Sequence, residues 1–178
     1  MTSPWRKHVA KWKGCRRCPL ADQRTMAVLA RGRIPAPILF VGEAPGASED
    51  VLGKPFAGPA GKLLDQIIEV ALDGQYDYCI TNLVACFPRE AKEDGTHEPP
   101  DEAIAACRPR LEEMLELVRP SLVVCVGKLA RKHLPKVEVP SVEILHPAAI
   151  LRADVAQRGL LVQRAIVTLS DAVGEILD

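Results

Sequence analysis

The chain has 178 residues, of which 48% are hydrophobic and 26% are charged, and its formal net charge at pH 7 is zero. This composition excludes disordered, collagen-like and coiled-coil proteins, and the length predicts one domain, residues 1–178, with a core of its own. Zero net charge, taken alone, argues against a general polyanion-binding protein, because nonspecific affinity for nucleic acids comes from an excess of basic groups.

The zero net charge is the sum of two oppositely charged segments. Residues 1–33 carry nine basic side chains and one acid, for a net charge of +8. Residues 90–119 carry nine acids and four bases, for a net charge of −5. Each segment is compatible with an ordinary solvated face, and a functional site beside the basic arm, residues 1–33, would favour a binding role instead.

The first residues are charged from Arg6 onward, and no apolar run in the chain approaches the ~18 residues that a membrane span needs. We therefore expect a cytoplasmic protein with no membrane partner. In a reducing compartment, six cysteines are not expected to form a disulfide framework, which leaves buried thiols or metal ligands.

Short apolar runs and amphipathic segments alternate along the chain. Strands are predicted at residues 38–42, 78–82, 121–127 and 142–145. Helices are predicted where apolar residues recur at helical spacing: Leu64, Ile67, Ile68 and Ala71; Ile104, Cys107, Leu111, Met114, Leu115 and Val118; and Val162, Ile166, Leu169, Val173 and Ile176. This alternation predicts an α/β fold, a three-layer α/β/α sandwich around a mainly parallel four-stranded sheet.

Polar residues follow three of these strands. Glu43 comes directly after the first strand, Asn82 ends the second, and His146 follows the fourth. Because ligands bind beyond the carboxyl ends of parallel strands, the topology brings the three side chains to one edge. Singly, each also suits a structural role in a loop or cap. The loop at residues 42–46 exposes backbone N–H groups that suit an oxyanion, but it lacks the features of a P-loop or a dinucleotide fingerprint.

Several segments closely resemble, in order, the signature of the iron–sulfur uracil-DNA glycosylases, the thermophile-type family four. They are GEAPG at 42–46, ED at 49–50, GKPFAGPAGKLLD at 53–65, TNLVAC at 81–86 and HPAAILR at 146–152. The resemblance covers about residues 15–152. It implies a DNA repair enzyme of the base excision pathway.

In this family four cysteines hold a [4Fe-4S] cluster, and the resemblance implies that role for Cys15, Cys18, Cys86 and Cys107. The cluster would act as a structural staple that orders the basic arm. Cys79 and Cys125 fall inside predicted strands and are expected to be buried thiols. From the residues alone, Cys15-x-x-Cys18 is also compatible with half of a zinc site or a redox pair, and Cys107 with a core position.

The resemblance also implies the reaction, in which uracil is flipped out of DNA and its N-glycosidic bond is hydrolysed to leave an abasic site. His146 would donate a hydrogen bond to uracil O2, Asn82 would read the Watson–Crick edge, and Phe56 would stack on the base. The backbone at Glu43 and Ala44 would line the pocket. Glu43 is the carboxylate nearest to the attacking water, so the expected catalytic residues are Glu43, Asn82 and His146.

We expect the DNA contacts to be local. Arg16, Arg17 and Arg152 are predicted to contact phosphates, and Pro147 is predicted to begin a wedge that fills the gap left by the flipped base. Nothing in this chemistry requires a dimer, so a monomer is expected, associated with the nucleoid through DNA.

Residues 87–91 read FPREA, where the family carries an arginine and an asparagine, and the stretch from 128 to 145 is short. These departures leave two alternatives open: a same-fold glycosylase for another modified or damaged base, and a non-catalytic DNA-binding module. The insert at residues 90–97 is expected to form an exposed loop. The acidic segment is expected to face away from the phosphates, so that neutralising Glu112 and Glu113 leaves DNA affinity largely unchanged.

Overall fold

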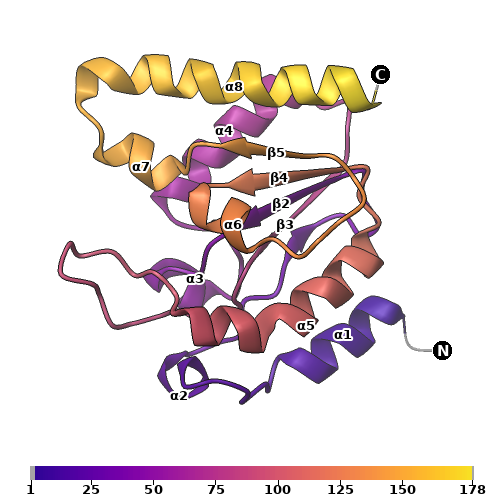
Figure 1. Ribbon diagram of the computed structural model, residues 1–178, viewed down its shortest axis with the longest axis vertical. Coiled ribbons are helices and arrows are strands. Elements are labelled where there is room, and N and C mark those ends of the chain that lie inside the picture. Colours follow the sequence, from indigo (N-terminus) through magenta and orange to yellow (C-terminus); the bar gives the residue numbers. More distant parts are fainter. Residues whose placement is uncertain (1–2, 178) are drawn as a thin grey trace.

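A five-stranded sheet lies between helices in this computed structural model, which describes residues 3–177 (Figure 1). The strands are β1 (Arg31–Gly32), β2 (Ile38–Gly42), β3 (Tyr78–Asn82), β4 (Leu122–Val126) and β5 (Ser141–Ile144). The helices are α1 (Pro4–Trp12), α2 (Leu20–Gln23), α3 (Ala47–Leu52), α4 (Pro59–Leu72), α5 (Asp101–Val118), α6 (Lys128–His133), α7 (Pro147–Arg152) and α8 (Val155–Leu177).

The strand order in the sheet is β1-β3-β2-β4-β5. The four predicted strands are present within one residue of their expected bounds, and they are parallel to one another. The expected strand number of four is wrong by one, because β1 pairs antiparallel with β3 at the edge of the sheet. A two-residue strand has no alternation of its own, so no sequence period indicates it.

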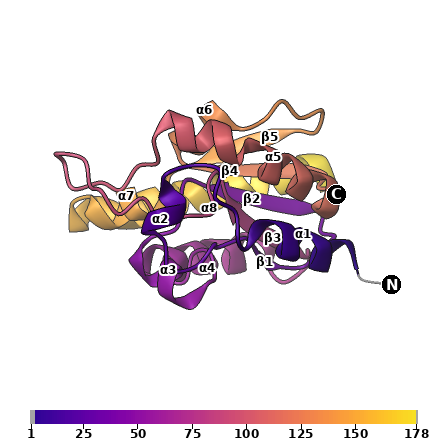
Figure 2. The same ribbon diagram turned by 90° about the horizontal axis from the view of Figure 1, so that it is seen from below.

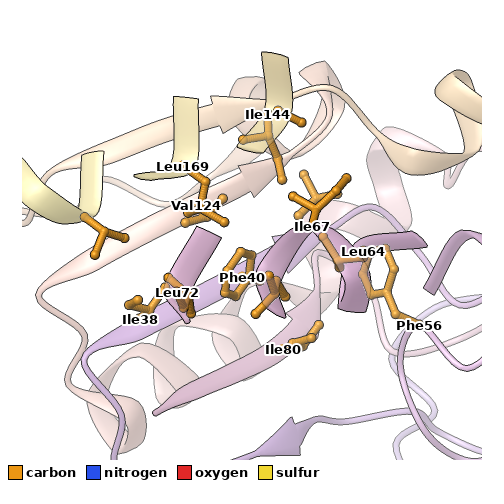
Figure 3. Close-up of a cluster of buried hydrophobic side chains, with 14 of the residues drawn as sticks. Ile38, Phe40, Phe56, Leu64, Ile67, Leu72, Ile80, Val124, Ile144 and Leu169 are labelled. Atoms are coloured by element: carbon orange, nitrogen blue, oxygen red, sulfur yellow. The ribbon is translucent and has the colours of Figure 1, made fainter. Parts of the chain in front are cut away.

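Alternate residues of each central strand face opposite helical layers. Ile38 and Phe40 belong to the core shared with α4 and α8, whereas Leu39 and Val41 belong to the core shared with α5. Figure 3 shows the first of these cores, in which side chains from the strands meet those from α4 and α8. Both faces of the sheet are therefore covered, as near-continuous apolar strands require.

The long helices keep the periods that predict them. Burial along α4 and α5 follows the expected faces, and α8 buries its stripe most deeply at Ala165, Leu169 and Val173. The α5 helix begins after Pro100 with two acids in its first turn, which favour the positive end of the helix dipole. Among residues 3–177, no helix is both long and apolar enough to cross a membrane.

The carboxyl ends of the parallel strands lie at one end of the molecule, together with α7, α3 and the loop after β3 (Figure 1). The N-terminal helix α1 lies along α5 on the other side of the sheet from α8, as Figure 2 shows from below. This arrangement brings the segments that follow β2, β3 and β5 together.

Candidate active site

Two of the polar residues predicted to meet at the sheet edge flank a glycine. In the parallel register Gly42 pairs with Asn82, and Glu43 follows Gly42. A Cβ atom at Gly42 would lie 2.4 Å from Asn82 Oδ1 and 2.5 Å from the ring of Phe56. Since no side chain fits there, Gly42 allows the amide and the aromatic ring to lie side by side.

A second glycine brings Glu43 and His146 together. Gly127 has a φ of +95°, and a Cβ atom there would lie 2.9 Å from Glu43 Oε1 and 3.1 Å from His146 Cβ. The rings of His146 and Phe56 are 5.8 Å apart between centroids, with an angle of 31° between their planes. The residues expected to bind the base and to act on the water thus gather from three loops and from the end of β3.

Phe56 is held by an unusual backbone conformation. Its φ of +53° is in the left-handed region, which costs a non-glycine residue free energy. The Phe56 carbonyl approaches Gly61 so closely that a Cβ atom there would lie 1.8 Å from the oxygen. Arg31 donates to the Pro55 carbonyl over 2.8 Å and pairs with Asp65 at 2.6 Å. These contacts fix the ring beside His146.

The Asn82 side chain is buried with its hydrogen-bonding groups unused. Only 1% of the residue is exposed, and neither Oδ1 nor Nδ2 has a hydrogen-bond partner among residues 3–177. A buried amide without partners costs roughly 1–3 kcal/mol, so such a group is typical of a binding site. An amide offers a donor and an acceptor at once.

The hydrogen bonding of His146 fixes where its proton lies. The Ala148 backbone N–H donates to Nδ1 over 3.1 Å, so a neutral ring carries its proton on Nε2. Burial, with a smaller contribution from Arg152, lowers the pKa of His146 to about 4. The ring is therefore neutral at pH 7 and presents Nε2–H as a donor.

Glu43 is partly buried and sits among charged side chains. Burial raises the pKa of the Glu43 carboxyl, Glu98 raises it further, and Arg152 and Lys92 act in the opposite direction. A carboxylate whose pKa is raised in this way is a better proton acceptor than an exposed one.

These residues border a cavity of about 620 Å³. Its lining includes Glu43, Ala44, His146 and Arg152, whereas Asn82 and Phe56 lie beside Gly42 and are not among the lining residues. Another cavity of similar size, lined by Trp5 and Arg119 among others, lies at the opposite edge of the sheet and contains no predicted catalytic residue.

The insert after β3 forms part of the cavity wall, which the sequence did not indicate. Residues 94–98 line the cavity together with Phe87. The insert is folded on itself, because Lys92 pairs with Glu98 at 2.7 Å and Asp94 accepts hydrogen bonds from Thr96. This part of the acidic segment therefore lies beside Glu43 and His146, and the expectation that the segment faces away from the phosphates stays a prediction.

Glu49 holds the loop after β2 in place. Its carboxylate accepts hydrogen bonds from the backbone N–H groups of Gly46, Ala57 and Gly58 at 3.0, 2.8 and 2.7 Å. The Gly46 N–H is thus not free for an oxyanion, contrary to expectation. Glu49 stands three residues after Gly46, and this capping-box spacing could have revealed it in the sequence.

The four cysteines expected to act as ligands lie around one cavity. Three arginines share its lining, which includes Cys15, Cys18, Cys86, Cys107, Arg17, Arg24 and Arg110. Burial raises the pKa of Cys86 to about 11 and also raises that of Cys18. Within the described part of the chain, no group of three or more His, Cys, Asp or Glu side chains is placed so that it could hold a metal ion. Cys79 and Cys125 are buried in β3 and β4, as predicted.

Glu113 attaches the basic arm to α5. Its carboxylate accepts hydrogen bonds from Lys11, His8 and Trp12 at 2.6, 2.9 and 3.0 Å. Although burial opposes it, these bonds lower the pKa of Glu113 to about 2. The arm that carries Cys15 is bonded to Glu113, so loss of this charge should weaken the attachment of the arm, while the expectation that DNA affinity stays largely unchanged remains a prediction.

The side chains expected to contact DNA lie in different settings. Arg16 and Arg17 are exposed, with Arg16 paired to Asp22 and Arg17 over the ring of Trp12. Pro147 is buried in the first turn of α7. The phosphate and wedge roles of Arg16, Arg17, Pro147 and Arg152 stay predictions.

Comparison with known proteins identifies the family. Residues 30–169 match the family model of the uracil DNA glycosylase superfamily. The chain is 40% identical over 121 residues to the type-4 uracil-DNA glycosylase of Sulfurisphaera tokodaii, which covers 67% of this chain and 53% of that protein. It is also 40% identical over 123 residues to the enzyme of that name from Saccharolobus solfataricus, covering 68% and 55%.

The chain thus spans little more than half the length of these relatives. Among solved structures, that of the Pedobacter heparinus protein SMUG2 has a similar fold, with a TM-score of 0.60 at 16% identity over 79% of this chain and 76% of that one. The conserved fold and the extent of the family match lead to one conclusion. The chain belongs to the uracil-DNA glycosylase superfamily.

Proposed function

We propose that this chain is a monofunctional uracil-DNA glycosylase that flips uracil out of DNA and hydrolyses its N-glycosidic bond. The observation that carries the proposal is the neutral His146 ring, whose Nδ1 accepts from Ala148 and whose Nε2–H is the remaining donor, beside Phe56. The type-4 uracil-DNA glycosylases named above support the choice of uracil.

The reaction needs a hydrogen-bond donor where negative charge develops. As the glycosidic bond breaks, the deoxyribose gains oxocarbenium character and the departing uracil gains negative charge. We assign His146 Nε2–H to uracil O2, where it stabilises the anion without first losing a proton to it. A preorganised donor of this kind contributes roughly 3–4 kcal/mol to transition-state stabilisation.

We assign recognition of the base to Asn82 and Phe56. The unpartnered amide of Asn82 suits uracil O4 and N3–H, since it offers one donor and one acceptor. Phe56, 5.8 Å from His146 between ring centroids, suits stacking on the flipped base. Binding of uracil would satisfy the buried amide, so its cost in the free protein becomes a gain in selectivity.

We assign the attacking water to Glu43. Its carboxyl lies close to Gly127 and His146 on the cavity wall, and its raised pKa favours accepting a proton. Because the transition state is dissociative, orienting the water and stabilising the positive sugar demand little basicity from this group.

We further propose that the four cysteines around the second cavity, Cys15, Cys18, Cys86 and Cys107, hold a [4Fe-4S] cluster. The ligands of such a cluster bind different irons, so they surround a space and do not converge on one point, which suits their placement around a single cavity. When bound, the cluster would supply a cross-link between the basic arm, the loop after β3 and α5.

DNA containing uracil is the proposed partner, and we expect the chain to act as a monomer. Arg152 on the cavity wall and Arg16 and Arg17 on the arm are proposed phosphate contacts. Phosphate contacts make binding sensitive to salt, so affinity for any duplex should fall as the salt concentration rises.

One observation favours a second candidate function. Phe87 and residues 94–98 lie on the cavity wall, where they border the space available to the base. A larger or differently substituted base would meet these residues. The second candidate is therefore a glycosylase of the same fold for another modified or damaged base.

The test is abasic-site formation on oligonucleotides that contain uracil, hypoxanthine or a modified cytosine. We expect product from uracil, with kcat lowered about 100- to 1000-fold in His146→Ala, and impaired binding in Asn82→Ala. His133→Ala serves as a control, since His133 lies on α6 outside the cavity lining. Product only from another base favours the second candidate. Binding without product on any base favours a non-catalytic module, and wild-type rates in both variants contradict the assigned site.

A further inference from the structure

Arg110 is a buried cation in the interior of α5. It is 1% exposed and heads the largest fully buried side chains of the described chain. Its guanidinium donates to Cys107 Sγ (3.4 Å), Thr81 Oγ1 (2.9 Å), and the carbonyls of Leu29 (3.5 Å), Leu83 (3.3 Å) and Asn82. The side chain thus contacts Cys107, an expected cluster ligand, and also the backbone at Asn82 and Leu83, where β3 ends.

None of these acceptors is a carboxylate. Arg110 forms no ion pair with any residue from 3 to 177, whereas other buried or half-buried charges, such as Asp50 with Arg89, are paired. Removing an unpaired guanidinium from water costs several kcal/mol, because arginine does not lose its proton in proteins. The N–H groups of the Arg110 guanidinium have acceptors, but no anionic side chain neutralises its positive charge.

A cluster held in the cysteine cavity would supply the missing anion. Arg110 lines it together with all four proposed ligands. A [4Fe-4S] cluster held by four thiolates is a dianion in its oxidised state. Arg110 and Arg24, which donates to Cys86 Sγ over 3.5 Å and to the Cys15 carbonyl over 2.7 Å, bring two positive charges to the same place. The cluster and the arginines that line the cavity, Arg17, Arg24 and Arg110, are therefore opposite in charge.

We propose that Arg110 is a positioning residue that joins the cysteine cavity to the uracil pocket: the cluster neutralises its charge, and its planar guanidinium fixes the Asn82 backbone. The inference rests on the proposed function. It extends the role of the cluster from stapling the arm to setting the position of the amide that reads the base. Arg24 would likewise face the negative charge of the cluster, since it contacts Cys86, but it contacts none of the pocket residues and so does not position Asn82.

The experiment compares the purified holoprotein with Arg110→Met, Arg110→Lys and Arg24→Gln. Arg108→Met is the matched control, since Arg108 lies on the same helix and donates to the His133 carbonyl instead of the cavity. Three quantities are measured for each: the half-life of the visible cluster absorbance under a chelator, the midpoint potential of the cluster, and kcat and KM on uracil oligonucleotides.

In Arg110→Met we expect the cluster half-life to shorten by about tenfold and KM to rise by about tenfold, with kcat changed less than about twofold. Its midpoint potential should become more negative, because a cation that stabilises the reduced cluster is gone. Arg110→Lys keeps the charge but not the planar fork, so it should restore the potential while KM stays raised. Arg24→Gln should lower the potential and leave the KM of the iron-loaded protein unchanged.

Wild-type potential and cluster half-life in Arg110→Met would overturn the inference, as would a KM equal to that of Arg108→Met. If Arg110→Met does not fold, Arg110→Lys decides, and a wild-type KM in this variant overturns the link to Asn82. If wild-type protein releases no base at all, the proposed function has failed. The potential and half-life then still decide whether Arg110 and the cluster neutralise each other.

Discussion

His146 should make the folding stability of this protein depend on pH in a way that one substitution removes. Burial lowers its pKa from 6.5 to about 4, so between these pH values the unfolded chain binds a proton at this residue and the folded protein does not. The contribution of His146 to the free energy of unfolding is therefore fully present above about pH 6.5 and is lost as the pH falls toward 4. His146→Gln has no titrating group and should not show this loss.

The size of the effect follows from the shift. A change from 6.5 to about 4 corresponds to about 3 kcal/mol in the free energy of unfolding, of which about 2.5 kcal/mol is lost by about pH 4.5. His8, whose pKa is also lowered by burial, acts in the same direction. Both proteins contain His8, so its contribution cancels when the wild type is compared with His146→Gln.

The measurement is urea unfolding of the two proteins at several pH values between about 7 and 4.5, and the difference between their unfolding free energies is plotted against pH. We expect the wild type to lose about 2.5 kcal/mol relative to the variant over this range. A difference that stays constant to within about 0.5 kcal/mol would refute the reasoning, because it would mean that charging His146 costs the folded state nothing.

Three further substitutions test the site. Glu49→Gln leaves one acceptor oxygen for three backbone N–H groups, so urea unfolding should show a loss of about 1–3 kcal/mol, whereas an unchanged midpoint would contradict the bracing role. Gly42→Ala places a Cβ atom 2.4 Å from Asn82 Oδ1, so KM for uracil DNA should rise at least about tenfold, and a wild-type KM would disprove the close packing. Glu113→Gln should cost about 1–2 kcal/mol at neutral pH and shorten the cluster half-life. Since the folded pKa of Glu113 is about 2, the stability it contributes is present above pH 4.5 and is lost as the pH falls toward 2, and equal acid sensitivity in wild type and variant would argue against this role.

The sequence predicts the parallel sheet and its helices because the strands are short apolar runs and the long helices keep a helical period, and tertiary contacts override neither pattern. The strands at 38–42 and 78–82 are buried on both faces, as expected where helices pack on both sides of a parallel sheet. Their topology also predicts that Glu43, Asn82 and His146 share an edge. What confirms this is the pair of glycines, Gly42 and Gly127, whose missing side chains let these groups approach one another.

Other parts of the site depend on contacts that no period encodes. Arg110 lies on the buried face of α5, and apart from Cys107 its partners come from segments 27 to 81 residues away. The insert at 90–97 has polar residues and no period, and only the fold places it on the cavity wall. Glu113 was read as part of an acidic surface, because its role depends on three donors about one hundred residues earlier.

The separation between Glu113 and its partners makes docking of the arm one of several contacts that close a long stretch of the chain. The bonds from His8, Lys11 and Trp12 span 105, 102 and 101 residues, and within the sheet β2 also pairs with the distant β4, Ile38 beside Leu122. Because the entropy cost of closing a loop rises only slowly with its length, docking of the arm and closure of the central sheet have similar entropic costs. Docking of the arm is also the step that would bring Cys15 and Cys18 to Cys86 and Cys107, so the proposed cluster site is complete only when these distant segments have met.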